Sequence, residues 1–263
     1  MLYSPHVTTT TSDDSVPATT ALPEGWYDVV GRGRMGTALA SALEAAGVSV
    51  RGPLGRGADG AGASVVLLCV PDREIADAAA AVGAGPLVGH VSASAPLDLL
   101  APHERFFIHP LLSVVGPGAR FAGAACAIDG STGRARAVAA ALADRLEMRP
   151  VVVAASDRAL YHAAASAASN YLVTLEAMAE RLAMAVGIDR AALVPLVRAT
   201  VDNWAALGAS GALTGPIVRG DEDTTSRQRE AVASATPDLV PFWDALAAET
   251  RRLAATVPGA PRA

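Results

Sequence analysis

Apolar residues recur along the chain in two different patterns, and the change between them falls near residue 155. Before that point, short runs of Val, Ile and Leu alternate with segments in which apolar residues return every three or four positions. This alternation predicts strands separated by helices, and therefore a Rossmann-like, parallel, doubly wound α/β sheet. The expected strands are YDVVG, VSVRG, SVVLLCV, PLVGHVS, RFFIHP, AACAIDG and RPVVVAA, and the expected helices lie near residues 34–46, 72–82, 95–101 and 131–146.

Beyond residue 155 the apolar spacing is helical throughout, so an all-α domain is expected to follow the sheet. Ser156 and Asp157 are suitable caps for a long helix that ends at Gly187. Further helices are expected at 189–207, near 222–235 and at 237–256. The predicted organisation is an α/β domain over 25–155 and a helical domain over 156–257, with disordered tails at 1–24 and 258–263.

Charge and composition exclude several classes of function. The formal net charge is −5 and no basic run is interleaved with aromatic residues, which argues against a nucleic-acid partner. All 21 basic residues are arginines, so the chemistry uses no lysine as Schiff base, phosphate ligand or general acid. No signal peptide and no uninterrupted apolar run of membrane-spanning length is recognisable, so we expect a cytoplasmic protein without membrane contact.

Neither a disulfide nor a metal site is expected. The two cysteines, Cys69 and Cys126, lie inside apolar strand patterns and are expected to be inert core thiols. His, Cys and carboxylate residues do not cluster at metal-ligand spacing, so we predict that the protein binds no metal.

Three glycines in the spacing GxGxxG follow the first expected strand and open the first expected helix. Gly31 permits a tight turn, Gly33 lets a pyrophosphate approach the backbone, and Gly36 lets the helix pack closely on the strand. The amides at the helix N-terminus then bind the phosphates. The sequence therefore predicts a dinucleotide site whose expected contacts are Gly31, Arg32, Gly33, Arg34, Met35, Gly36, Arg51, Arg56, Val70 and Pro71.

The residues that follow the second strand favour NADP(H) over NAD(H). An NAD site carries Asp or Glu about 20 residues after the first glycine. This chain has Arg51 there and Arg56 in the glycine-rich loop beyond, and a guanidinium binds a 2′-phosphate bidentately. The alternative is that both arginines are solvated loop residues. Asp72, next to Pro71, lies either beside the cofactor or at the cap of the following helix.

Five longer motifs resemble one bacterial family. GRGRMGTALASALEAAG, VVLLCVPDREI, RFFIHPL, YHAAASAASNYL and ALTGPIVRGDEDT are similar to motifs of the Rossmann-like family that carries domain of unknown function 2520, over about residues 25–255. That family is related to 6-phosphogluconate and β-hydroxyacid dehydrogenases and to ketopantoate and pyrroline-5-carboxylate reductases. The resemblance implies a nicotinamide-binding domain followed by a dimerisation domain of the 6-phosphogluconate dehydrogenase C-terminal type, whose first helix contributes to the active site.

In the β-hydroxyacid relatives that helix carries a lysine and an asparagine four residues apart. Here Ser166 and Asn170 have that spacing, so the asparagine matches and the lysine does not. On a regular helix His162 shares their face, within an arc of about 100°. We expect His162 to donate a proton to the substrate while Ser166 and Asn170 orient the reacting oxygen. The alternative is a solvated helix face, because two glutamates continue the same stripe.

Two sheet-edge segments complete the expected site. Ser92 and Ser94 stand where the resemblance implies a serine and glycine turn that binds the substrate carboxylate. His109 belongs to a His-Pro pair that matches the family and ends the fifth strand. We expect it to be either a second proton donor or a structural imidazole bonded to the backbone.

The motif LTGPIVRGD places three more candidates in a loop between helices. Thr214 and Arg219 are expected to bind the substrate, with the guanidinium on its carboxylate and Asp221 fixing the orientation of that guanidinium. The alternative is an internal pair between Arg219 and Asp221 that only closes the loop.

Together these features predict an NADPH-dependent reductase of a small keto or imino carboxylic acid, with ketopantoate as the leading substrate by resemblance. Two alternatives stay open: an NADP-binding sensor or scaffold without redox turnover, which the missing lysine favours, and a pocket recruited for non-redox chemistry in a specialised biosynthetic pathway. Small residues along the long helix (Ala163, Ala164, Ala167 and Ala168) predict a homodimer through the helical domain.

Overall fold

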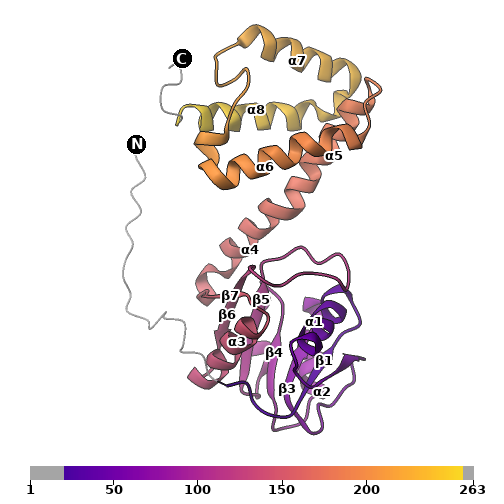
Figure 1. The fold of residues 1–263 in the computed structure, drawn as a ribbon, viewed down its shortest axis with the longest axis vertical. Helices are drawn as coiled ribbons and strands as arrows, with labels where there is room; N and C mark the ends of the chain where they lie inside the picture. The colour runs from indigo at the N-terminus through magenta and orange to yellow at the C-terminus, as the bar shows by residue number, and fades with distance from the viewer. Residues whose placement is uncertain (1–20, 257–263) are drawn as a thin grey trace. The chain divides into compact units, whose positions relative to one another are not determined.

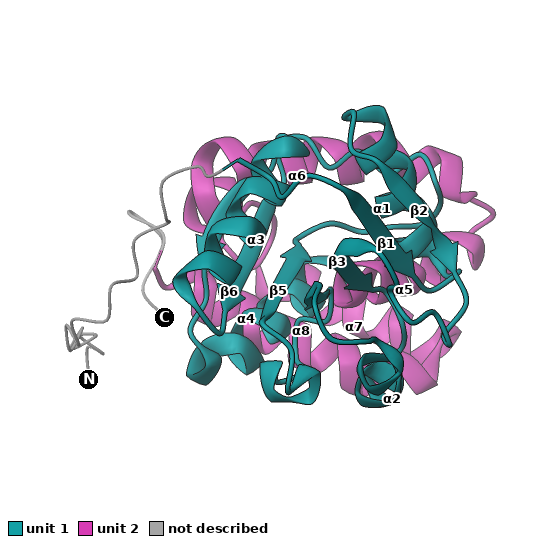
Figure 2. Ribbon diagram, turned by 90° about the horizontal axis from the view of Figure 1, so that it is seen from below, with its two compact units in different colours: residues 1–169 teal, residues 170–263 magenta. Residues whose placement is uncertain are grey.

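The computed structural model describes residues 21–256, which fall into two compact units (Figures 1 and 2). The first unit ends at Ser169 and the second begins at Asn170. Nearly all of the two predicted tails lies outside the described residues. Within the described range no helix is long and apolar enough to cross a membrane.

The first unit is built on a seven-stranded sheet, and each strand forms from one of the seven predicted apolar runs. The strand order is β2-β1-β3-β4-β5-β6-β7 (Figure 1). The strands are β1 (Trp26–Val30), β2 (Val50–Leu54), β3 (Ala63–Leu68), β4 (Leu87–His90), β5 (Arg105–Pro110), β6 (Ala125–Gly130) and β7 (Arg149–Val152). The α/β class with a helical C-terminal region is therefore confirmed.

One strand pair departs from the predicted parallel sheet. β5 and β6 are antiparallel, with His109 opposite Ala127, whereas every other pair in the sheet is parallel. A parallel pair needs a crossover connection, usually a helix, to carry the chain back along the sheet. Residues 111–124 contain only turns and coil, so the chain reverses directly into β6.

Helices cover both faces of this sheet. On one face α1 (Arg34–Ala45) and α3 (Gly133–Arg145) pack in a core with the inward residues Val65 and Leu67 of β3. On the other face α2 (Ile75–Ala81) packs on the alternate residues Val66 and Leu68 of the same strand (Figure 2). Successive strand residues point to opposite faces, so β3 is buried on both sides. Cys69 and Cys126 are buried free thiols in this unit.

Three short 3₁₀ segments belong to the first unit. η1 (Asp72–Glu74) leads into α2, η2 (Leu97–Leu100) replaces the helix expected at 95–101, and η3 (Ala155–Asp157) precedes α4 (Arg158–Ser166). The last strand ends at Val152, but the first unit continues through α4 to Ser169. The division therefore falls later in the chain than the predicted boundary at 155.

The long helix expected from 156 to 187 is not regular. α4 is followed by a π-helical turn, Ala167–Tyr171, and then by α5 (Leu172–Met184). The side chain of Thr174 donates to the carbonyl of Asn170 (3.1 Å), in the π-helical turn. The two units divide inside this turn.

The second unit contains α5, α6 (Arg190–Ala212), α7 (Glu222–Ala235), η5 (Pro237–Leu239) and α8 (Val240–Ala254). Asp189 and Asp221 cap α6 and α7 by accepting bonds from backbone amides. α6 breaks at Gly208, which has φ of +71°, directly after the predicted helix end at 207. Several large apolar side chains on α6 and around α5 are exposed: Tyr171, Val173, Met184, Val186, Leu196, Trp204 and Leu207.

Candidate functional site

The glycine turn between β1 and α1 has the geometry that the sequence predicts. Gly31 has φ of +120°, and a Cβ added there would lie 2.2 Å from the carbonyl oxygen of Cys69. A Cβ on Gly36 would lie 1.9 Å from the carbonyl oxygen of Gly31. Gly33 has no heavy atom within 4 Å of its Cβ position, so its backbone faces open space. Two glycines thus serve close packing and one leaves the backbone accessible.

A hollow of about 450 Å³ opens beside this turn, between the carboxyl ends of β1, β2 and β3. α1 begins at its edge. Its N-cap is Gly33, which has no side chain to bond the first amides of the helix, so these amides are available to an anion. The hollow is lined by Gly31, Arg32, Gly33, Leu54, Gly55, Arg56, Cys69, Val70 and Pro71. Six of the predicted cofactor residues therefore line one hollow. Of the others, Arg34 is exposed at the start of α1, and Met35 packs against the core.

Arg51 lies away from this hollow, contrary to the prediction. β2 continues to Leu54, so Arg51 is its second residue and not its end. Its guanidinium makes two bonds to the buried carboxylate of Asp28 (2.6 and 2.8 Å) and a third to the carbonyl of Ala61. A buried carboxylate needs a partner of this kind, so the charge of Arg51 is already used. The guanidiniums beside the hollow are those of Arg32 and Arg56, and Arg56 pairs with Glu74 at 2.9 Å.

A second group of polar side chains gathers where β4 and β5 end. His109 Nδ1 lies 2.8 Å from the hydroxyl of Tyr161 on α4, and the two rings meet edge to face with centroids 5.5 Å apart. The ring of His162 lies 6.4 Å from that of His109. The structure thus brings the two predicted donors His109 and His162 near each other. It also adds Tyr161, which sequence reasoning missed although it directly precedes His162.

His90 is a buried histidine of the same region. Its side chain is 0% exposed, and its Nδ1 accepts a hydrogen bond from the amide of Ser92 (3.2 Å). Burial, together with the guanidinium of Arg158, lowers the pKa of His90 to about 4. Burial, and to a smaller extent the charge of nearby His162, lower the pKa of His109 to about 4 as well. Both imidazoles are therefore neutral near pH 7.

The two predicted serines have different environments. Ser92 Oγ accepts bonds from the amides of Ser94 (3.2 Å) and Ala95 (3.0 Å), so it holds the turn after β4. Ser94 Oγ donates to the carboxylate of Asp72 (2.8 Å). Asp72 follows Pro71 as the first residue of η1. Because its carboxylate accepts the hydrogen bond from Ser94, it faces the serine turn. A polar edge therefore continues from the hollow toward His90.

Arg158 anchors α4 to the sheet and was not singled out by the sequence. Its side chain is buried, with a 2.7 Å bond to Asp129 and a 3.5 Å bond to the carbonyl of Ala95. The guanidinium carbon lies 4.4 Å from the ring centroid of Phe107, a cation–π distance. Because α4 also carries Tyr161, this anchor fixes the position of the tyrosine beside His109.

The arc predicted for His162, Ser166 and Asn170 assumed a regular α-helix. His162 is exposed and Ser166 half-buried on α4, whereas Asn170 lies in the π-helical turn. A π turn bonds residue i to i+5, so the three residues do not lie on one regular α-helix. Their shared face stays a prediction.

The loop candidates lie in the second unit. Asp221 accepts the amide of Thr224 (3.0 Å) as the cap of α7, and this hydrogen bonding, with smaller effects of Arg219 and Arg227, lowers its pKa. Its carboxylate is thus used to start a helix. Arg219 is exposed.

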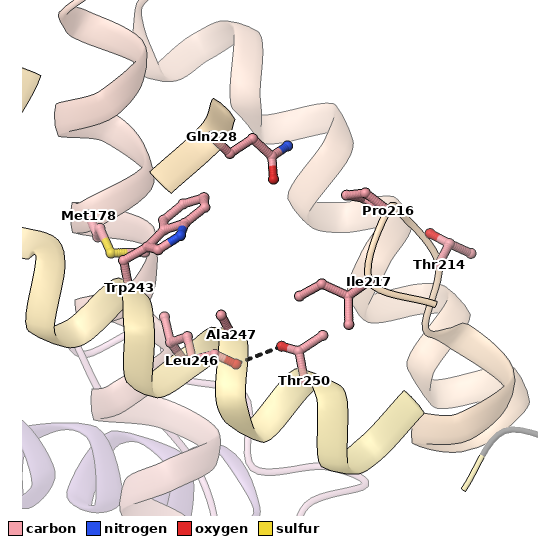
Figure 3. A pocket seen from close by; sticks show the side chains of 9 residues that line it. All are labelled: Met178, Thr214, Pro216, Ile217, Gln228, Trp243, Leu246, Ala247 and Thr250. Carbon is pink, nitrogen blue, oxygen red and sulfur yellow. Dashed lines mark hydrogen bonds between the residues drawn. The ribbon is translucent and has the colours of Figure 1, made fainter. Parts of the chain in front are cut away.

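Thr214 borders a mainly apolar cavity of about 180 Å³ inside the second unit (Figure 3). Trp243 and Ile217 project toward this space, and Thr250 donates its hydroxyl to the carbonyl of Leu246 (2.8 Å). The remaining lining residues are Met178, Pro216, Gln228 and Ala247. The cavity is closed mostly by carbon atoms, so it offers little to bind a carboxylate.

Acidification from pH 7 to pH 5 is expected to lower the free energy of unfolding through His90 and His109. An unfolded histidine titrates near pH 6.5, whereas both folded imidazoles have a pKa of about 4. The unfolded state therefore binds more protons between these values, at up to about 1.4 kcal/mol per pH unit for each group. Urea unfolding at both pH values should show that the free energy of unfolding falls less on acidification in His109→Gln than in the wild type. Equal decreases in the two proteins would contradict a lowered pKa of His109.

Comparison with known proteins gives a family match over part of the chain and a fold. The sequence profile of the family DUF2520, a domain of unknown function, matches residues 124–250 and confirms the resemblance there. A search of curated protein sequences finds no match.

Several solved structures share the fold. Protein BF3122 from Bacteroides fragilis, provisionally described as an NADP oxidoreductase, is 19% identical with a TM-score of 0.74, over 87% of this chain and 98% of that one. Protein TM1727 from Thermotoga maritima is 20% identical with a TM-score of 0.71, over 88% and 98%. Pyrroline carboxylate reductase from Plasmodium falciparum, solved with NADP bound, is 9% identical with a TM-score of 0.59, over 89% and 100%. At these identities the likeness shows a common fold.

Proposed function

We propose that the protein is an NADPH-dependent reductase of a small keto or imino carboxylic acid, because it has a glycine turn of the dinucleotide-binding type and residues 124–250 match the DUF2520 model. The observation that carries the proposal is the glycine turn. Gly31 and Gly36 have no room for a side chain, while Gly33 exposes its backbone to a hollow beside the free amides of α1. This arrangement fits a pyrophosphate.

NADPH is the proposed cofactor because the hollow carries two guanidiniums, those of Arg32 and Arg56. The segment that follows β2 reads Gly55-Arg56, without the carboxylate that holds the ribose hydroxyls in NAD sites. The ion pair with Glu74 holds Arg56 at the rim of the hollow. When bound, the cofactor supplies a hydride to a polarised C=O or C=N bond.

Replacing Arg56 with glutamine is expected to weaken NADPH binding about 10- to 100-fold and to leave NADH binding nearly unchanged. The variant loses charge-assisted bonds to the 2′-phosphate, which are worth about 1.5–3 kcal/mol. Titration of both dinucleotides by nicotinamide fluorescence measures the difference. Arg73→Gln is the matched control, because Arg73 contacts the same Glu74 but is 82% exposed outside the hollow. An equal loss of NADH and NADPH affinity in Arg56→Gln would count against the 2′-phosphate contact.

The proposed substrate site lies at the polar edge formed by Ser94, Asp72, His90 and His109, beside the hollow. His109 is the proposed proton donor of this edge, and His162 is close enough to take part in the same proton transfer. The proposed roles of Ser166, Asn170, Thr214 and Arg219 in substrate orientation rest on the family motifs. Keto and imino acids, with ketopantoate first, are the substrates to test.

NADPH oxidation followed by nicotinamide absorbance tests the reaction against a panel of 2-oxo acids, ketopantoate and cyclic imino acids. Consumption of NADPH with at least one of them is the expected result. Tight NADPH binding without oxidation by any member of the panel would favour a binding protein without redox turnover.

We also propose that the chain acts as a homodimer through its helical unit. The support is the set of large apolar side chains that α6 and the ends of α5 expose, such as Leu196 and Trp204. Exposed apolar area of this kind marks protein interfaces.

A further inference from the structure

We propose that Tyr161 is the positioning residue that makes His109 a neutral proton donor, through a relay from the tyrosine hydroxyl across the imidazole to the substrate. The inference rests on the proposed reduction. It concerns the pair at the end of β5, where the hydroxyl of Tyr161 lies 2.8 Å from Nδ1 of His109.

The pair is held rigidly on both sides. His109 is fixed in the β5–β6 ladder opposite Ala127, and Tyr161 is on α4, which the bonds of Arg158 to Asp129 and to the carbonyl of Ala95 anchor to the sheet. The edge-to-face packing of the two rings adds a second constraint. The hydroxyl is 3.4 Å from the carbonyl of His109, farther than its 2.8 Å from Nδ1, and a backbone hydrogen bond with Ala127 also acts on it.

The direction of this hydrogen bond follows from acidity. Burial raises the pKa of Tyr161 to about 12, and burial lowers that of His109 to about 4, so the phenol keeps its hydrogen and the imidazole is neutral. A phenol hydroxyl is a stronger acid than a neutral imidazole N–H, and an imidazole nitrogen is a stronger base than a phenol oxygen. Tyr161 therefore donates to Nδ1, and the hydrogen of the ring is on Nε2.

This tautomer gives the site a proton donor that needs no positive charge. The chain has no lysine, and a histidine with a pKa of about 4 carries almost no positive charge near pH 7. A neutral Nε2–H still donates. As hydride reaches a carbonyl carbon, Nε2–H of His109 protonates the new alkoxide, and the hydroxyl hydrogen of Tyr161 moves to Nδ1. The imidazole stays neutral. The tyrosinate then takes its hydrogen back from Nδ1 while Nε2 takes a proton from water, which restores the starting tautomer.

The charged and titratable groups around the pair are few. His162 and Asp72 shift the pKa of His109 in opposite directions, the buried His90 also interacts with His109, and the thiol of Cys126 lies near Tyr161. Neither His162 nor Asp72 replaces the contact of Tyr161 at Nδ1, because that contact already occupies the nitrogen. The relay therefore depends on one hydroxyl.

Tyr161→Phe tests the relay. We expect kcat with the best keto acid of the panel to fall about 100-fold, with KM for NADPH changed less than about twofold, and the solvent deuterium isotope effect on kcat to decrease. Tyr27→Phe is the matched control: it also loses a buried tyrosine hydroxyl, which donates to the carbonyl of Pro23 at 2.9 Å, and should keep wild-type kinetics. Thermal unfolding of both variants separates a kinetic effect from loss of folded protein.

A second readout does not depend on turnover. Long-range ¹H–¹⁵N spectra of labelled protein, with His109 assigned by comparison with His109→Gln, report which ring nitrogen carries the hydrogen. The expected result is a single Nε2–H form in the wild type and a mixture of tautomers in Tyr161→Phe. An Nδ1–H form in the wild type, or wild-type kcat in Tyr161→Phe, overturns the relay. If NADPH binds but no keto or imino acid is reduced, the proposed function fails. The measured tautomer still shows whether Tyr161 donates the hydrogen bond to His109.

Discussion

Gly36→Ala is expected to abolish measurable NADPH binding and to destabilise the first unit by about 2 kcal/mol or more. The added Cβ would lie 1.9 Å from the carbonyl oxygen of Gly31 and 3.3 Å from Cβ of Cys69. The first obstacle is backbone, so α1 has to move away from β1 and take its buried Leu39 and Leu43 out of the core. Alanine gains at most about 1 kcal/mol of helix propensity over glycine, which is too little to offset the clash.

Urea unfolding and NADPH fluorescence titration measure the two effects separately. Gly33→Ala is the control within the same turn, because Gly33 has φ of −77° and open space around its Cβ position. That variant should keep wild-type stability and still lose NADPH affinity, since its methyl group fills the space through which a phosphate reaches the amides. Wild-type stability and affinity in Gly36→Ala would show that α1 does not pack on the turn as described.

The features that the sequence predicted are those set by local pattern. The apolar runs located all seven strands; in central strands such as β3, burial on both faces requires a continuous apolar segment. The glycine spacing located the turn, because Gly31 and Gly36 each pack against backbone of the turn or of the segment after β3, while Gly33 leaves the backbone open. The helix expected at 189–207 is capped by Asp189 and breaks at Gly208.

The features that the sequence did not predict depend on pairs far apart in the chain. Arg51 was assigned to a phosphate because nothing in its neighbourhood reveals Asp28, its partner across β1 and β2. The bond between His109 and Tyr161 joins residues 52 positions apart. Its existence depends on α4 returning to the edge of β5, which no periodicity encodes. The antiparallel β5–β6 pair likewise depends on the path of a connection without regular structure.

Arg158→Met is expected to lower the free energy of unfolding of the first unit by about 3 kcal/mol. Methionine keeps most of the apolar volume against Phe107 but leaves the carboxylate of Asp129, which is 17% exposed, without its 2.7 Å partner. Arg136 approaches the same carboxylate only to 3.6 Å and does not replace that bond. Breaking one side of a buried pair costs more than the pair contributes, because a charge remains in a poorly solvated site.

The double variant Arg158→Met, Asp129→Asn should therefore recover most of that loss, since it removes the stranded charge along with its partner. Arg134→Met is the surface control in the same unit: Arg134 pairs with Glu104 but is 64% exposed, so its loss should cost less than about 1 kcal/mol. Because α4 carries Tyr161 as well as Arg158, the single variant should also reduce turnover, and the double variant should restore it only as far as it restores the packing of α4. Equal destabilisation in the single and double variants would mean that Arg158 stabilises the unit through its contact with Phe107 and not through Asp129.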